Sequence, residues 1–272
     1  MTRRFSFPAL ALFSFLMMIF LYAPLAVATL YAFNSGPNLT WPPQGFSLRW
    51  FEKIFSDSGF RQALIVSFQA ALLTSLIASL IGAAGAFVFT RVRSRRARGV
   101  EALGRLPVML PPLFIGIGLV ALMKLTSFSP SLATIVLGHT IIAVPFVILV
   151  VVSRLRTYDP ELELAARDLG ATPSQALMRV TLPLIAPAIF GAALLAFAFS
   201  FDEILITNFT SGTQSTIPIY VLGRLRRVVD PGANAVAVIL LLIPWIAFGI
   251  GHVVLKRLTG SGLTEALMQR VR

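Results

Sequence analysis

The chain has no cysteine, only two histidines and few charged residues. Without cysteine it forms no disulfide and no thiolate metal site, although a membrane protein can lack cysteine in any redox compartment. The sequence also contains no HExxH zinc motif, no GxSxG nucleophile elbow and no GxxxxGK[ST] phosphate loop. The chain therefore cannot hydrolyse ATP alone by the usual P-loop route, and we expect it to be no enzyme.

The two histidines, His139 and His252, lie far apart on apolar segments. Such spacing does not suggest a shared metal site. We expect His139 to be a helix residue that faces a polar neighbour.

Charge is scarce because the chain is strongly apolar. Charged residues make up 12% of the 272 residues, whereas 57% are hydrophobic and 22 are phenylalanine. This composition excludes an ordinary soluble globular domain and indicates that the lipid bilayer is the solvent.

Six apolar segments are candidates for membrane-spanning helices, since roughly 20 apolar residues cross the hydrocarbon layer. They lie near residues 9–33, 64–90, 107–125, 132–152, 184–206 and 235–255. The third is marginal in length. The first is too long for the hydrophobic region of a signal peptide, and we interpret it as an uncleaved span. The sequence thus predicts an all-α membrane protein with a single transmembrane domain, 1–272.

The basic residues indicate the orientation of these spans. With six spans, 16 of the 23 lysines and arginines fall on one side of the membrane. The other side holds Arg49, Lys53, Arg61, Lys124, Arg224, Arg226 and Arg227. The positive-inside rule then places both termini in the cytoplasm. The net charge of +12 is thereby explained by topology, and we expect no nucleic-acid binding.

A polar segment, residues 159–183, separates the fourth and fifth spans. Asp159 can cap a first helix, and Gly170 is a good stop for it. Thr172 can cap a second helix, which Pro183 should limit. Helical spacing predicts one apolar face on each helix, formed by Leu162, Ala165, Ala166 and Leu169 and by Ala176, Leu177 and Val180.

This segment also carries a family resemblance. The alanine pair Ala165-Ala166, Gly170 and the later Leu182-Pro183 resemble the EAA loop of permease subunits of bacterial ABC importers. In that family the loop forms coupling helices that dock into a groove of a cytoplasmic ATPase. The resemblance implies that the ATPase-coupling residues are Glu163, Ala165, Ala166, Leu169, Gly170, Ala171, Leu182 and Pro183.

One position departs from the family pattern. The family's glutamate usually precedes the alanine pair directly, and here Leu164 stands there, with Glu163 one step earlier. One step turns a helical side chain by about 100°, so Glu163 does not simply replace the missing carboxylate.

The resemblance further implies the six-span fold of type I ABC importer permeases in a bacterial inner membrane. Its implied partners are a second permease subunit in a heterodimer, two cytoplasmic ATPase subunits, a periplasmic solute-binding protein and membrane lipid. The ATPase would use ATP with magnesium, and no cofactor would be bound by this chain.

An acidic pair, Asp202-Glu203, follows an uncharged run near the outer end of the fifth span. Charges within a span are costly and mark candidate functional positions. With Phe199 and Phe201 nearby for cation–π contact, the pair would suit a passing organic cation. Alternatively, both carboxylates reach interfacial water or pair with the arginines of 224–227.

The stretch around this pair resembles spermidine/putrescine importer permeases. The likeness lies in Ser200-Phe201-Asp202-Glu203, Thr210-Ser211-Gly212 and Ile217-Pro218. It implies polyamine import. Related permeases on the same framework import ferric iron, thiamine or other solutes. An ATP-independent secondary transporter is a further alternative, although the chain shows no internal repeat of the kind that many such transporters contain.

Overall fold

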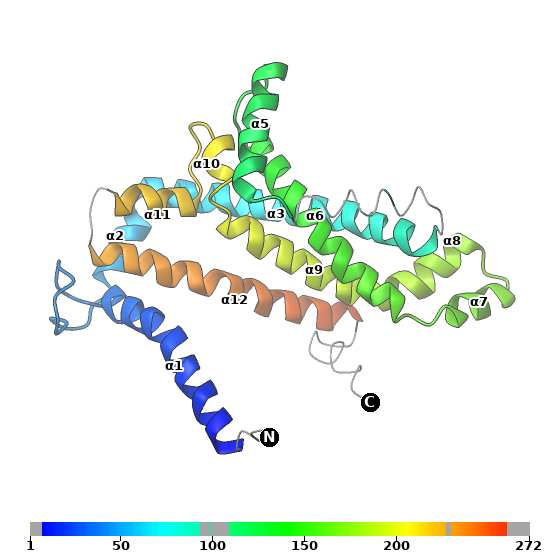
Figure 1. Ribbon diagram of the computed structural model, residues 1–272, viewed down its shortest axis with the longest axis horizontal. Coiled ribbons are helices and arrows are strands. Elements are labelled where there is room, and N and C mark those ends of the chain that lie inside the picture. Colours follow the sequence, from blue (N-terminus) through cyan, green and yellow to red (C-terminus); the bar gives the residue numbers. More distant parts are fainter. Residues whose placement is uncertain (1–6, 93–98, 100–108, 227–229, 260–272) are drawn as a thin grey trace, which may run out of the picture. The chain divides into compact units, whose positions relative to one another are not determined.

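A computed structural model describes residues 7–92, 99, 109–226 and 230–259 of the chain, and its regular structure there is helical (Figure 1). In these ranges the helices are α1 (Phe7–Ala32), α2 (Arg49–Ser56), α3 (Ser58–Arg91), α5 (Pro112–Thr126), α6 (Leu132–Arg156), α7 (Glu161–Asp168), α8 (Pro173–Ala176), the π-helix η1 (Leu177–Thr181), α9 (Leu182–Asp202), α10 (Thr207–Thr210), α11 (Ile217–Leu225) and α12 (Pro231–Thr259). The prediction of an all-α membrane fold is confirmed.

Five helices of the described ranges are long and apolar enough to cross a membrane. They cover Leu10–Ala32, Ser58–Arg91, Leu132–Arg156, Pro173–Asp202 and Pro231–Val253. Each corresponds to a predicted span. The helices of the predicted spans 64–90, 132–152 and 235–255 extend beyond these limits. The helix of the predicted span 184–206 starts earlier, at Pro173, and ends earlier, at Asp202.

The predicted third span, 107–125, is shorter in the structure. Its helix α5 has 15 residues, and residues 107 and 108 lie outside the described part of the chain. Such a helix is about 22 Å long, against about 30 Å of hydrocarbon. Pro112 occupies the first turn of α5, where proline's missing N–H costs no hydrogen bond, so the proline pair sets the start of the helix.

The chain divides into two compact units, each described by itself. The first comprises residues 1–61 and 221–243, and the second comprises 62–220 and 244–272. In the first unit, Asn34 is fully buried and organises the loop after α1. Its side-chain Nδ2 donates to the Asn38 carbonyl at 3.0 Å, and its own carbonyl accepts from Trp50 Nε1 at 2.8 Å.

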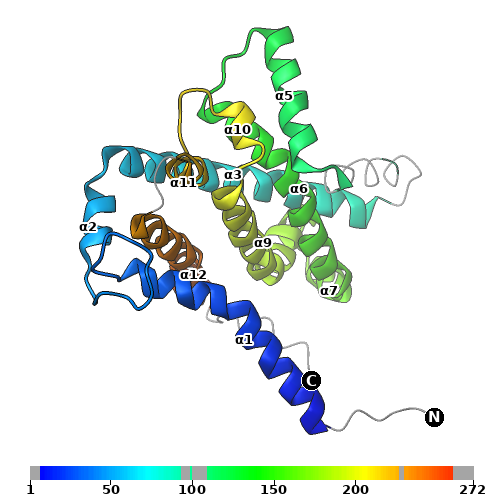
Figure 2. The ribbon, with the colours of Figure 1, turned by 60° about the vertical axis from the view of Figure 1, so that its left-hand side comes forward.

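The second unit is built around the pairing of α6 with α9, which lie side by side in both views (Figures 1 and 2). Its buried core combines small residues of α3 with larger ones of α6 and α9, among them Ala78, Val147 and Ile185. Gly82 allows α3 and α6 to approach closely. A Cβ added at Gly82 would lie only 2.6 Å from Val147 Cγ1 of α6. Small residues permit such close packing of helices within a membrane.

Candidate functional site

The polar segment at residues 159–183, called the hairpin from here on, forms two helices joined by a turn. Asp159 Oδ1 accepts the backbone N–H of Glu161 at 2.9 Å, as expected for a residue that caps the start of α7. The helix ends at Asp168, and Gly170 follows with a φ of +90°. The N–H of Ala171 then donates to the Ala166 carbonyl at 3.0 Å. Gly170 thus terminates α7 in the left-handed conformation that glycine adopts at least cost.

The second helix of the hairpin starts as predicted but does not stop at Pro183. Thr172 caps α8 through a reciprocal pair of hydrogen bonds with Gln175. From Pro173 the helix then continues through η1 into α9 and ends only at Asp202. Pro183 is accommodated because the wider π-helical turn of η1 directly precedes it, where a missing N–H and the proline ring disturb least.

The predicted apolar faces of the hairpin differ in exposure. Leu162 and Leu169 of the first helix are 47% and 90% exposed. In contrast, Ala176 of the second helix is only 1% exposed, and Leu182 packs against the core of the second unit. Of the two predicted apolar faces, the one on α7 and its turn is therefore the more exposed, although Met178 of η1 is also 60% exposed. Leu164, which stands where the family has its glutamate, is also exposed, at 55%, but it points about 200° around the helix from Leu162 and therefore lies on another face of α7.

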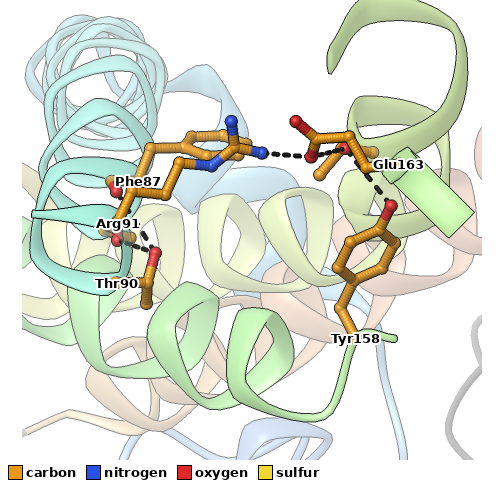
Figure 3. A network of polar contacts seen from close by, with 7 residues as sticks. Phe87, Thr90, Arg91, Tyr158 and Glu163 are labelled. Carbon is orange, nitrogen blue, oxygen red and sulfur yellow. Dashed lines mark hydrogen bonds and ion pairs between the residues drawn. The ribbon is translucent and has the colours of Figure 1, made fainter. Parts of the chain in front are cut away.

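Glu163 points about 100° around α7 from Leu162 and contacts residues of its own chain (Figure 3). Its Oε2 lies 2.6 Å from Arg91 Nη2 at the end of α3 and accepts the Thr181 hydroxyl at 2.9 Å. The Glu163 side chain is only 17% exposed. Sequence reasoning did not identify Arg91 as its partner, because 72 residues separate the two and no local spacing rule relates them.

The acidic pair lies where α9 ends, four residues earlier than the end of the predicted span. Glu203 has an extended backbone, and the short helix α10 begins at Thr207. Residues 203–206 are called the break from here on. Glu203 Oε1 accepts the N–H of Ile206 at 2.9 Å, and Thr207 Oγ1 donates to the Glu203 carbonyl at 2.8 Å. These bonds satisfy backbone groups that the interrupted helix leaves free.

The residues predicted to surround the acidic pair are not equally accessible. Asp202 is exposed, and within the described part of the chain its side chain makes no hydrogen bond. Phe199 is 47% exposed and lies against Phe146. Phe201, however, is 2% exposed and stacks on Phe197, so its ring belongs to the core.

Of the arginines considered as alternative partners of the acidic pair, Arg224 contacts another carboxylate. Arg224 binds Asp230 through Nη2 at 2.8 Å. Arg227 lies outside the described residues.

His139 of α6 connects the two sides of the break. It is 3% exposed, and its ring nitrogens lie 2.7 Å from Ser200 Oγ of α9 and 2.8 Å from Thr207 Oγ1 of α10. In the neutral ring one nitrogen donates and the other accepts. The expectation that His139 faces polar neighbours is confirmed. The sequence did not indicate that these neighbours flank the break.

We expect His139→Ala to lower stability by about 1–3 kcal/mol, because it removes the hydrogen-bond partner of the buried Ser200 hydroxyl and one of the two hydrogen bonds of Thr207 Oγ1. The purified chain should melt several degrees lower in a detergent thermal-shift assay. Thr140→Val is the matched control, since Thr140 Oγ1 is buried without a hydrogen-bond partner in the described structure. Equal melting temperatures for His139→Ala and Thr140→Val would contradict a stabilising role for the imidazole.

The described residues contain no group of three His, Asp or Glu side chains that could hold a metal ion. The hairpin and the break lie at opposite ends of the continuous helix 173–202 (Figure 1). Because the helix is continuous, a movement of the hairpin at one end can be transmitted to the break at the other end.

Comparison with known proteins identifies the family. Residues 78–260 match the model of the binding-protein-dependent transport system inner membrane component. The chain is 34% identical to the putrescine transport system permease protein PotI of Escherichia coli (strain K12), over 82% of each chain. It is 30% identical to the spermidine/putrescine transport system permease protein PotC of Haemophilus influenzae, over 85% of this chain and 90% of the relative.

The solved structures agree on the fold. A chain of a bacterial alginate ABC transporter, in complex with an alginate-bound periplasmic protein, superimposes with a TM-score of 0.71 at 17% identity. The match covers 94% of this chain and 95% of the other. The chain therefore belongs to the binding-protein-dependent transport system inner membrane components and is a permease subunit of a type I ABC importer.

Proposed function

We propose that this permease subunit imports polyamines of the putrescine and spermidine type. The observation that carries the proposal is the acidic pair at the end of a spanning helix, with Asp202 exposed and free of hydrogen bonds within the described structure. An accessible carboxylate at the end of an apolar helix favours a cationic solute. Two relatives whose names specify putrescine or spermidine point to the same class. The fold alone does not select the solute, because a transporter of alginate shares it.

The coupling of this import to ATP is assigned to the hairpin. In this proposal the exposed face of α7 that carries Leu162 and, at the turn, Leu169 docks against a cytoplasmic ATPase. An apolar surface beside a rigid glycine turn is suited to a protein contact. Docked in this way, the hairpin transmits ATP-driven closure of the ATPase to the helix 173–202 and thereby to the break.

The assembly in the proposal contains this chain, a second and different permease subunit, two ATPase subunits and a periplasmic solute-binding protein. The chain itself is non-catalytic and binds no cofactor, while the ATPase uses ATP with magnesium. Both termini and the hairpin are on the cytoplasmic side, as the distribution of basic residues indicates.

Uptake of labelled putrescine tests the solute assignment. Cells that lack the gene for this chain are compared with cells that express it, with unlabelled spermidine, thiamine or ferric iron as competitors. We expect competition by spermidine alone. Uptake that spermidine leaves unchanged, or that one of the other solutes suppresses, would contradict the polyamine assignment.

Dependence on the energy source separates the ATP-driven mechanism from the secondary-transporter alternative. Depletion of ATP with the ion gradients maintained should stop uptake. Collapse of the gradients with ATP maintained should leave most of it. The opposite pattern would favour the alternative.

A further inference from the structure

The end of α3 is tied to the hairpin by a compact polar cluster. Arg91, the last residue of α3, extends its guanidinium to Glu163 in the first turn of α7 (Figure 3). Both charges suit their helix ends, since a cation is favourable at a C-terminus and a carboxylate at an N-terminus. The Arg91 guanidinium also lies over the Phe87 ring, 5.5 Å from its centroid, which restricts its orientation.

The same carboxylate oxygen reaches a third element. Glu163 Oε2 accepts a hydrogen bond from Thr181, the last residue of η1, and Thr181 is fully buried. Tyr158, in the connection that precedes α7, places its hydroxyl 3.4 Å from Thr181 Oγ1. The Glu163 side chain therefore joins α3, α7 and η1.

The location of Thr181 connects the polar cluster to a membrane-spanning helix. It lies at the end of the π-helix, directly before α9, within the continuous helix that leads to the break. Turns of π-helix are rare and occur frequently at functional sites. A movement of α7 that pulls on Glu163 therefore acts on α3 and on the base of α9 together.

We infer that Arg91, Glu163 and Thr181 form a transmission brace, through which movement of the hairpin reaches two membrane-spanning helices at once. This inference rests on the proposed function, in which the hairpin docks on an ATPase. It assigns Glu163 a role different from the one that the family resemblance implies. Glu163 is a positioning residue inside the permease, and the docking surface is the exposed side of α7.

Substitutions that keep or remove the charges test the brace in the assembled transporter, reconstituted in liposomes with its binding protein. Glu163→Gln and Arg91→Gln remove the ion pair, while Arg91→Lys keeps the positive charge. Glu52→Gln is the control, because Glu52 is an exposed carboxylate of α2, outside the hairpin. Three quantities are measured: the amount of ATPase that co-purifies, the rate of ATP hydrolysis and the rate of solute uptake.

We expect both glutamine variants to retain the ATPase and to hydrolyse ATP, but to transport about three- to tenfold less solute per ATP, the range typical of residues in a coupling network. Arg91→Lys should recover at least half of the loss, and Glu52→Gln should behave as wild type. In the double variant Arg91→Gln/Glu163→Gln the losses should not multiply, because each substitution removes the same contact.

Other outcomes overturn the brace and leave the proposed function standing. If Glu163→Gln loses the co-purifying ATPase while Arg91→Gln keeps it, Glu163 is a docking residue. If solute transported per ATP is unchanged in both variants, the ion pair has no part in coupling. If their losses multiply in the double variant, the two side chains act independently. Failure of the wild-type chain to co-purify with an ATPase would instead overturn the proposed function, and the brace with it.

Discussion

Gly170→Val is expected to abolish solute uptake while the chain still inserts in the membrane at normal levels. Gly170 has a φ of +90°, and no atom outside its own turn lies within 4 Å of the position that a Cβ would occupy. The substitution therefore causes no clash, and its cost is conformational. A β-branched residue held at positive φ costs on the order of 1–3 kcal/mol, enough to displace the hairpin from its helix–turn–helix geometry.

The measurement compares uptake with the amount of chain in isolated membranes. Gly249→Val is the matched control, because Gly249 lies within α12 with equally open space and no positive φ. We expect Gly170→Asn to fall between wild type and Gly170→Val, since asparagine tolerates left-handed conformations better than valine. Normal uptake by Gly170→Val would contradict the requirement for this turn.

The second large effect is expected from neutralisation of the acidic pair. Asp202→Asn with Glu203→Gln should reduce kcat/KM for cation uptake by about tenfold or more, the scale of one hydrogen bond between a charged and a polar group. Glutamine at 203 keeps an oxygen that can accept from the Ile206 N–H, so the break should stay intact. The double substitution then removes the negative charges without changing the structure of the break.

The single variants Asp202→Asn and Glu203→Gln show how much each carboxylate contributes to the loss of uptake. Asp202→Asn should cause the larger loss, since Asp202 is the exposed member of the pair. Glu52→Gln, an exposed carboxylate of α2, controls for the change in net charge. If the double variant keeps its uptake of the cation unchanged, direct recognition by this pair is wrong.

The sequence allowed the fold class and five of the spans to be predicted, because a stretch of about 20 apolar residues has few alternatives to a transmembrane helix. It also allowed the start and turn of the hairpin to be predicted. Asp159, Gly170 and Thr172 act through local backbone bonds whose geometry depends on nearby residues alone. Local rules failed at Pro183, where a π-helical turn lets the helix continue.

The orientation of side chains within the spans could not be predicted. Phe199 and Phe201 are two residues apart in a uniformly apolar helix, yet they are 47% and 2% exposed. Apolar periodicity carries little information where both lipid and core accept the same residues. Contacts between distant segments were equally inaccessible, as the pairing of Arg91 with Glu163 and of His139 with Thr207 illustrates.

The most direct test of the account is the composition of the complex that this chain forms. The tagged chain is purified in mild detergent from its native membrane, and the co-purifying proteins are identified by mass spectrometry. The account predicts an ABC ATPase and a second permease subunit in stoichiometric amounts. Recovery of the chain alone or only with itself, under conditions that preserve a control importer, would contradict it.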